Sequence, residues 1–516
     1  MNTRILSAVV VLVLCAAALA DGPAVTSEPT TQPKITPGYD TTRITAPLRA
    51  DGTVDYLAAL NEAYSKGVTP ANNAAVKLVE AIGPKMFPDP IRDEALKQLG
   101  VTLPAKGEYF EDYINPTSDG LTAYNQALKG PWQAGMYPEL AAWLEKNEAP
   151  LARFLEASRR PRYYLPLLAD SEGALPSMIF SALPSLGGYR GLARATIIHA
   201  NLALAEGRPA DAWRDLLAVH RMGRLIGQSP ALIGRLVSIA VCALADTATQ
   251  AMLASGTLTA EQAQQVLKDL VALSPAPTIA SCIDEGERYS MLDSLAYIAM
   301  QPTAMDKLLT GSSGGPAEST GNKLLKRLSS AMMDSGVDWN EVLRRSNRYY
   351  DELAADMRQP TYAQRAAAMK EMESAIEQTV RRAHGLPIAT SEPATQPGQP
   401  NAKTRWMADR MLPILLPSLG QVQILADGAA ARHDMALLAA GLAVYKAQNG
   451  KYPDTLAALS PAIFKTVPQD LFSGKPFLYT STGQGYLLYS VGENMTDNKA
   501  ADMAAGGDDI VLKTPQ

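Results

Sequence analysis

The densest group of acidic side chains in the chain lies between residues 284 and 293. Asp284, Glu285, Glu287 and Asp293 interrupt a stretch that is otherwise largely apolar. Paired carboxylates can supply the general acid and the general base of a hydrolase, which makes Glu285, Glu287 and Asp293 candidate catalytic residues. However, Arg288 follows Asp284 by one helical turn, which is the spacing of a salt bridge on a helix surface. The sequence leaves the catalytic and the structural interpretation open.

Two runs combine arginines with tyrosines. They are Arg159-Arg-Pro-Arg-Tyr-Tyr164 and Arg344-Arg-Ser-Asn-Arg-Tyr-Tyr350. Guanidinium groups beside aromatic rings could hold a polyanion or a sugar acid. The alternative is a helix end and a solvated helix face with buried tyrosines.

The chain contains only four histidines. His199 and His220 lie on opposite arms of a helical hairpin predicted at residues 192–226, so the two side chains could approach one another. No spacing of cysteine or histidine supplies the further ligands that a zinc site needs. We therefore expect core or surface histidines, and we find no phosphate-binding loop or nucleophile elbow.

The first 20 residues have the features of a signal peptide. Arg4 precedes an apolar run from Ile5 to Leu14, and Ala18-Leu-Ala20 forms a small-residue cleavage site. This pattern predicts export to the periplasm or the extracellular space. Lipid anchoring at Cys15 is disfavoured, because Leu14 stands where a small residue is needed, and no further transmembrane segment is expected.

The composition limits the partners and the redox chemistry. A formal net charge of −5 argues against nonspecific binding of nucleic acid, so we expect an envelope protein or polymer as partner. After cleavage of the signal, two cysteines remain, Cys242 and Cys282. In an oxidising compartment they could pair, and the alternative is two buried free thiols.

The middle of the chain has the periodicity of a helical bundle. Residues 51–386 form the predicted helical domain, with helices over 231–254, 259–273 and 278–300 and a flexible loop at 309–322. Thr259, Asp338 and Thr361 are each followed three residues later by Gln or Glu, as in a capping box.

Two segments rich in proline and threonine lie before and after this domain. Residues 21–50 are predicted to be disordered, and so is a linker at 387–403. The octet that begins at Thr26 recurs with one change at Thr390, which supports the same assignment for both segments.

After the linker the pattern changes from helical to alternating. A helix ends at Gly450, and short aromatic runs at 477–479 and 485–490 are separated by Thr480-Ser-Thr-Gly-Gln484, which predicts a hairpin. Residues 509–513 supply a third strand. The overall prediction is a mainly α fold, a multi-helix bundle followed by a small α+β module at 404–516.

This module resembles the globular domain of type II secretion major pseudopilins. The resemblance covers about 75 residues and rests on Tyr452-Pro453, the 468–476 run Pro-x-Asp-x-Phe-x-Gly-x-Pro, Tyr479, Tyr489-Ser-x-Gly492 and Asp508-Asp-Ile510. In that family the loop before the last strand holds calcium. The resemblance implies Asn494 and Asp509 as ligands, with Asp497 and Asp508 close by, although Asn494 replaces an aspartate of the family and the loop is longer.

A weaker resemblance covers most of the chain. The 47–56 run Pro-Leu-Arg-Ala-Asp-Gly-Thr-Val-Asp-Tyr and the Ala212-Trp-Arg-Asp-Leu-Leu217 run resemble those of uncharacterised exported proteins of planctomycete bacteria. This resemblance implies that the protein is exported, and it assigns no activity.

Two functions follow as hypotheses. The first is a noncatalytic exported scaffold or interaction protein, with a C-terminal module that calcium could stabilise. The second is an envelope-polymer hydrolase that uses carboxylates on the 279–300 helix.

Overall fold

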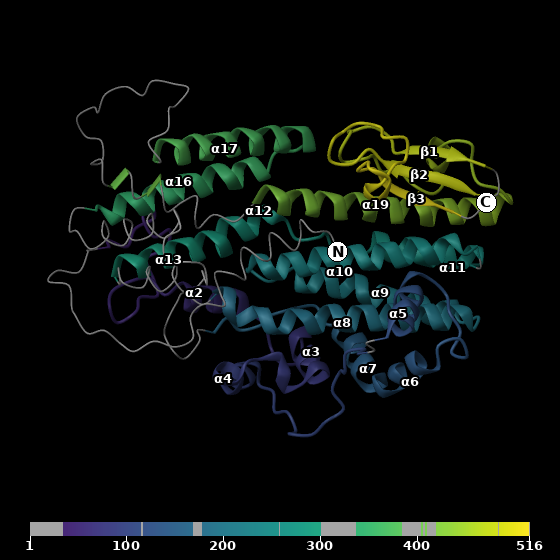
Figure 1. Cartoon of the computed structure of the whole chain (residues 1–516), viewed down its shortest axis with the longest axis horizontal. Helices are drawn as coiled ribbons and strands as arrows, with labels where there is room; N and C mark the ends of the chain where they lie inside the picture. The colour runs from purple at the N-terminus through teal and green to yellow at the C-terminus, as the bar shows by residue number, and fades with distance from the viewer. Residues whose placement is uncertain are drawn as a thin grey trace.

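The computed structural model describes residues 35–114, 117–168, 178–256, 258–300, 337–383, 404–405, 408–409, 419–482 and 485–514. The described part is mainly helical, with one small antiparallel sheet near the C-terminus, as the sequence predicts. Long helices run side by side along the long axis of the molecule, with the sheet at one end (Figure 1). The predicted signal peptide, the 309–322 loop and the 387–403 linker lie outside the described residues.

A series of short helices precedes the predicted hairpin. They are α2 (Tyr56–Ser65), α3 (Ala74–Ile82), α4 (Asp89–Leu99), α5 (Ser118–Lys129), α6 (Pro138–Lys146) and α7 (Glu148–Ala157). Gly100 ends α4 in the left-handed conformation that glycine allows.

Thr69 and Asn73 are both residue types that can cap a helix, and α3 begins after the second of them. Asn73 is the N-cap, because its side chain accepts a hydrogen bond from the Ala75 amide. The same side chain is held by the backbone of Tyr164, whose amide donates to Asn73 Oδ1 at 2.9 Å.

The predicted hairpin is confirmed as α8 (Met178–Ala205) and α9 (Pro209–Ile226). Gly207 makes the turn between them with a φ of 74°. The next helices, α10 (Leu232–Ala254) and α11 (Ala260–Val271), pack on this pair, and Thr259 with Gln262 forms the predicted capping box of α11.

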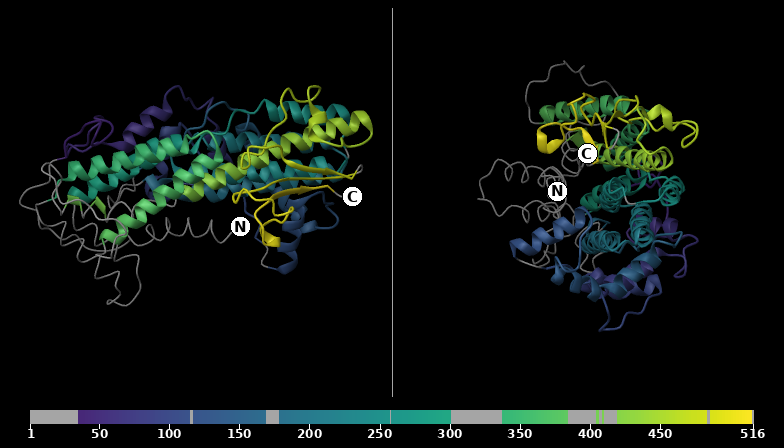
Figure 2. Two further views of the ribbon diagram at one scale, coloured as in Figure 1. Left: turned by 90° about the horizontal axis from the view of Figure 1, so that it is seen from above. Right: turned by 90° about the vertical axis from the view of Figure 1, so that its right-hand side faces the viewer.

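A second group of helices extends the bundle. It begins with α12 (Ile279–Cys282), which continues through a π-helical turn at Ile283–Glu287 into α13 (Arg288–Met300). Helix α16 (Trp339–Met357) packs against α13 and α17 (Tyr362–Ala383), and Figure 2 shows these helices lengthwise and end-on. Asp338 caps α16 as predicted.

The C-terminal part consists of a long helix and a sheet. Helix α19 (Leu419–Asn449) lies against the sheet of β1 (Leu478–Ser481), β2 (Tyr486–Ser490) and β3 (Ile510–Lys513), which are antiparallel in the order β1-β2-β3. Asp470 is buried in the loop before β1. It accepts hydrogen bonds from Ser490 Oγ at 2.7 Å and from the Val491 amide at 3.3 Å, and these bonds hold the loop against the end of β2. This arrangement confirms the predicted three strands.

Helix α19 also packs on α10 and α11, so the C-terminal part does not stand apart from the bundle. One hydrophobic core runs without a break from Leu78 of α3 through Val241 of α10 and Leu438 of α19 to Leu512 of β3. Because burial of such apolar surface is the main stabilising term, the two parts support each other.

Residues 35–50, which the sequence placed in a disordered segment, pack against the bundle instead. Thr41 and Thr42 are each 2% exposed. The hydroxyl of Tyr56 donates to the Thr42 carbonyl at 2.8 Å, and Asn347 of α16 donates to the Thr41 carbonyl at 2.8 Å. These contacts with distant side chains order the segment, so the ordered chain begins before residue 51.

Helix α10 is the one helix in the described ranges with the length and apolar composition of a membrane span. In its most apolar window 61% of the residues are buried inside the protein, as in the core helix of a bundle. Cys242 lies on this helix and Cys282 on α12, and both are buried free thiols.

Candidate functional site

The three acids proposed for catalysis have separate environments. Glu285 is exposed, and its Oε2 accepts a hydrogen bond from the Tyr64 hydroxyl at 2.7 Å. Asp293 is 2% exposed and forms an ion pair with Arg49, with Oδ1 and Nη1 2.7 Å apart. The salt bridge anticipated between Asp284 and Arg288 is present, with Oδ1 and Nη2 2.6 Å apart. Glu285 and Asp293, two of the three candidates, are thus engaged by other side chains.

Glu287 differs, because burial raises the pKa of its carboxyl from 4.5 to about 7. Between these two values the folded protein keeps a proton that the unfolded chain has lost, so stability falls as the pH rises through this window. We expect Glu287→Gln to increase the free energy of unfolding by about 1–3 kcal/mol at pH 8 and to change little at pH 4. Urea unfolding at the two pH values measures this difference, and an equal effect at both would contradict it.

The first arginine-tyrosine run leads to a surface cleft. The cleft has a volume of about 210 Å³ and is bounded by α7 with the residues that follow it, by α9 and by α11. Its polar lining comprises Ser158, Arg159, Trp213, Arg214, Arg221 and Asp269. Three guanidinium groups and one carboxylate therefore line the cleft.

The arginines of the cleft differ in their existing partners. Arg214 is engaged by Asp211 at 2.9 Å and by Asp215 at 3.0 Å. Asp269 accepts a hydrogen bond from Trp213 Nε1 at 2.8 Å. Within the described ranges, no hydrogen bond or ion pair engages the exposed side chains of Arg159 and Arg221. These two guanidiniums are available to an acidic ligand.

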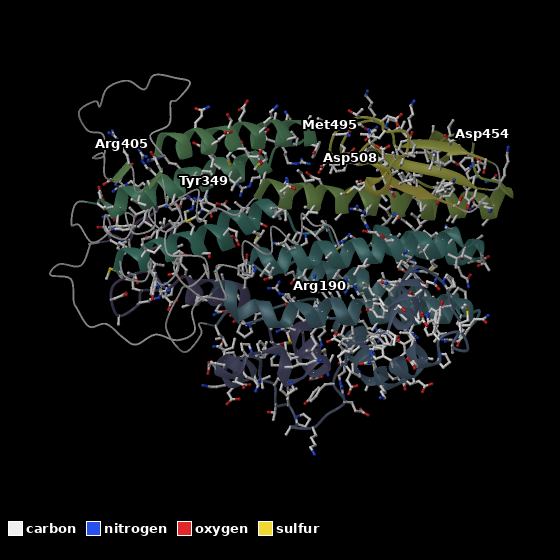
Figure 3. The ribbon with its side chains drawn as sticks, viewed as in Figure 1. Arg190, Tyr349, Arg405, Asp454, Met495 and Asp508 are labelled. Atoms are coloured by element: carbon white, nitrogen blue, oxygen red, sulfur yellow. The ribbon has the colours of Figure 1, made fainter. Side chains whose placement is uncertain are left out.

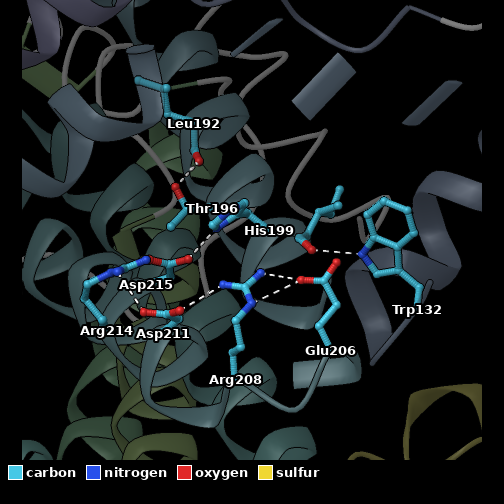
Figure 4. A network of polar contacts seen from close by, with 10 residues as sticks. Trp132, Leu192, Thr196, His199, Glu206, Arg208, Asp211, Arg214 and Asp215 are labelled. Carbon is cyan, nitrogen blue, oxygen red and sulfur yellow. Dashed lines mark hydrogen bonds and ion pairs between the residues drawn. The ribbon is translucent and has the colours of Figure 1, made fainter. Parts of the chain in front are cut away.

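A polar network supports the cleft from the hairpin side. His199 of α8 and Asp215 of α9 are joined by a contact of 2.6 Å between Nδ1 and Oδ2 (Figure 4). The second oxygen of Asp215 accepts from Arg214, and Arg208 at the turn contacts Glu206 and Asp211. The network joins the two arms of the hairpin and holds Arg214 beside the cleft.

His220 has other partners than His199. Its Nε2 lies 2.9 Å from Thr249 Oγ1, and its Nδ1 lies 3.8 Å from Asp246 Oδ1 of α10. The same oxygen of Asp246 lies 3.0 Å from Nδ1 of His433, on α19. His220, Asp246 and His433 offer one ligand atom each within 4.8 Å of one another, which makes them a candidate metal centre. Sequence spacing could not show this group, because its members come from three helices.

The acids assigned to calcium lie in the loop between β2 and β3. Asp508 Oδ2 accepts from the Asn494 amide at 2.7 Å, and Asp509 Oδ2 accepts from the Ala500 amide at 2.8 Å. Asp497 accepts from the Lys499 amide at 2.7 Å. Figure 3 places Asp508 near Met495 of the same loop, away from Asp454. The loop is thus folded around its own carboxylates, which bind backbone amides.

The second arginine-tyrosine run lies on α16. Arg344 pairs with Asp40 at 2.7 Å, Arg348 pairs with Glu341 at 3.0 Å, and Tyr350 is buried. This run therefore fits the alternative of a helix face with internal ion pairs.

No protein-family model, no curated protein and no solved structure matches this chain.

Proposed function

We propose that this chain is an exported, noncatalytic scaffold that binds an acidic envelope polymer in the arginine cleft. The observation that carries the proposal is the pair of unengaged guanidiniums, Arg159 and Arg221, on the border of a cleft of about 210 Å³. A guanidinium binds a carboxylate through two parallel hydrogen bonds, so two of them favour a ligand with repeated acidic groups.

The size of the cleft indicates a chain rather than a free small molecule. Sites that enclose drug-sized ligands have volumes of roughly 300–1,000 Å³, so this cleft suits a single acidic unit. The neighbouring units of a polymer would continue over the surface. A uronic acid polymer supplies the required carboxylates at a regular repeat.

The scaffold part of the proposal is supported by the shared core. Because α19 packs on both the bundle and the sheet, the C-terminal module is held in a fixed place relative to the cleft. The pseudopilin resemblance of this module and the export signal remain proposals that agree with an envelope role.

The hydrolase alternative is favoured by one observation, the raised pKa of Glu287, a property that suits a general acid. Catalysis by two carboxylates also needs an ionised partner. Glu285 accepts a hydrogen bond from Tyr64, and Asp293 forms an ion pair with Arg49, so both carboxylates already have structural partners. Binding without reaction is the better account.

The binding proposal is tested by calorimetric titration of oligogalacturonate into the full chain. We expect binding that weakens with salt, because the contacts are ionic. The double variant Arg159→Gln/Arg221→Gln should bind at least about tenfold more weakly, since each charge-assisted hydrogen bond contributes about 1.5–3 kcal/mol.

Two controls accompany this titration. A neutral oligosaccharide of the same length should not bind, and Arg348→Gln should bind as the unaltered protein does, because Arg348 lies on α16 outside the cleft. Equal affinity of the double variant and the unaltered protein would exclude the cleft as the binding site.

A further inference from the structure

The group of His220, Asp246 and His433 has no part in the proposed polymer binding. Helix α9 contributes His220, α10 contributes Asp246 and α19 contributes His433. His220 and Asp246 are fully buried, while the side chain of His433 is 18% exposed. The group therefore lies inside the contact between the bundle and the long helix of the C-terminal module, with one edge open to solvent.

Two atoms of this buried group lack a hydrogen-bond partner among the described residues: Nδ1 of His220 and Oδ2 of Asp246. The two residues approach each other, but the distance of 3.8 Å between His220 Nδ1 and Asp246 Oδ1 is too long for a hydrogen bond. Leaving buried polar atoms unpaired is unfavourable, so such atoms need an explanation.

The two ring nitrogens of His220 have different neighbours. Nε2 lies 2.9 Å from Thr249 Oγ1, and Nδ1 faces Asp246 Oδ1 at 3.8 Å. If Nε2 donates its proton to Thr249, the lone pair of Nδ1 faces the oxygen of Asp246. The lone pair of His220 Nδ1 and a lone pair of the Asp246 carboxylate then point at each other, and a cation bound by both atoms removes the repulsion.

The distances suit a cation of the transition series. Zinc binds imidazole nitrogen at about 2.0–2.1 Å and carboxylate oxygen at about 2.0–2.2 Å, so a nitrogen and an oxygen bound to one ion lie no more than about 4.3 Å apart. The observed separations from Asp246 Oδ1 are 3.0 Å to His433 and 3.8 Å to His220. Neutral imidazole with one carboxylate is also a ligand set that such metals favour.

Other charged groups lie nearby. The half-buried guanidinium of Arg432 interacts favourably with Asp246, and the half-buried carboxyl of Asp434 interacts with His433. Arg432 lessens the need for a cation, but no hydrogen bond or ion pair between its guanidinium and Asp246 is found in the described ranges.

We propose that His220, Asp246 and His433 bind one divalent transition metal ion, and that this ion fastens α19 to α9 and α10. The three protein ligands leave a coordination position open to water. Because the ion is held by residues of both parts, it stabilises the docking of the C-terminal module on the bundle. The proposal is independent of the arginine cleft.

The test is titration of the full chain with Zn²⁺ after treatment with a chelator. We expect one ion per chain, a rise in the thermal midpoint because a ligand bound only by the folded state stabilises it, and visible ligand-field bands when Co²⁺ replaces Zn²⁺. His433→Ala should weaken Zn²⁺ binding by at least about 100-fold, since loss of outer-sphere partners alone reduces affinity by 10–100-fold.

The matched control is His199→Ala, because His199 belongs to the separate pair with Asp215. It should bind Zn²⁺ as the unaltered chain does. If His433→Ala does not fold, the conservative variant His433→Gln takes its place. Equal Zn²⁺ affinity in the control and in the His433 variant, or no bound ion in the unaltered chain, would overturn the proposal.

Discussion

Replacing Arg365 with methionine should destabilise the protein by about 3–5 kcal/mol, because it leaves a buried carboxylate without its counter-charge. Arg365 of α17 binds Asp427 of α19 with Nη2 and Oδ1 2.8 Å apart, and the two side chains are 9% and 8% exposed. After the substitution Gln423 is the one remaining hydrogen-bond donor to the Asp427 carboxylate among the described residues. Chemical denaturation at pH 7 measures the change in the free energy of unfolding.

The double variant Arg365→Met/Asp427→Leu supplies the control. Removal of both charges eliminates the unpaired carboxylate, so most of the lost stability should return. The single variant should also regain stability at acidic pH, where Asp427 is neutral, since burial already raises the pKa of this carboxyl. A double variant as unstable as the single one would show that packing, not charge, explains the loss.

Replacing Gly286 with alanine should destabilise the protein by about 3 kcal/mol or more, the upper range for overpacking. Gly286 lies in the π-helical turn before α13, and an added Cβ would stand 2.0 Å from the carbonyl oxygen of Pro230. Because the obstacle is backbone, relief requires this turn and the residues that precede α10 to move apart. The thermal midpoint and the urea midpoint should both fall.

The control for this substitution is Gly135→Ala. No heavy atom lies within 4 Å of a Cβ built at Gly135, so the free energy of unfolding should change by less than about 0.5 kcal/mol. A similar loss in both variants would indicate a general effect of removing glycine rather than a close approach at Gly286.

The elements of the fold were predictable where the signals are local. The capping box of Thr259 and the N-cap of Asp338 are read from neighbouring residues, and both helices begin where these residues predict. The start of α3 was not predictable in this way, because Thr69 and Asn73 are both suitable caps. The choice depends on hydrogen bonds between Asn73 and Tyr164, which is 91 residues away.

The same difference between local and distant signals applies to the sites. Arg214 and Arg221 are two turns apart on α9, so the face that they share could have been found from the sequence. The contact of Asp246 with His433 joins residues 187 positions apart. Only the packing of α19 on α10 brings them together, and no spacing rule encodes that packing.

The central claim, that the chain binds an acidic polymer without altering it, is tested most directly by size-exclusion chromatography after a long incubation of protein with polygalacturonate. We predict that polymer of unchanged length elutes together with the protein and that the Arg159→Gln/Arg221→Gln variant elutes apart from it. Shortened polymer, formed by the unaltered chain but not by Glu287→Gln, would contradict the claim and support the hydrolase instead.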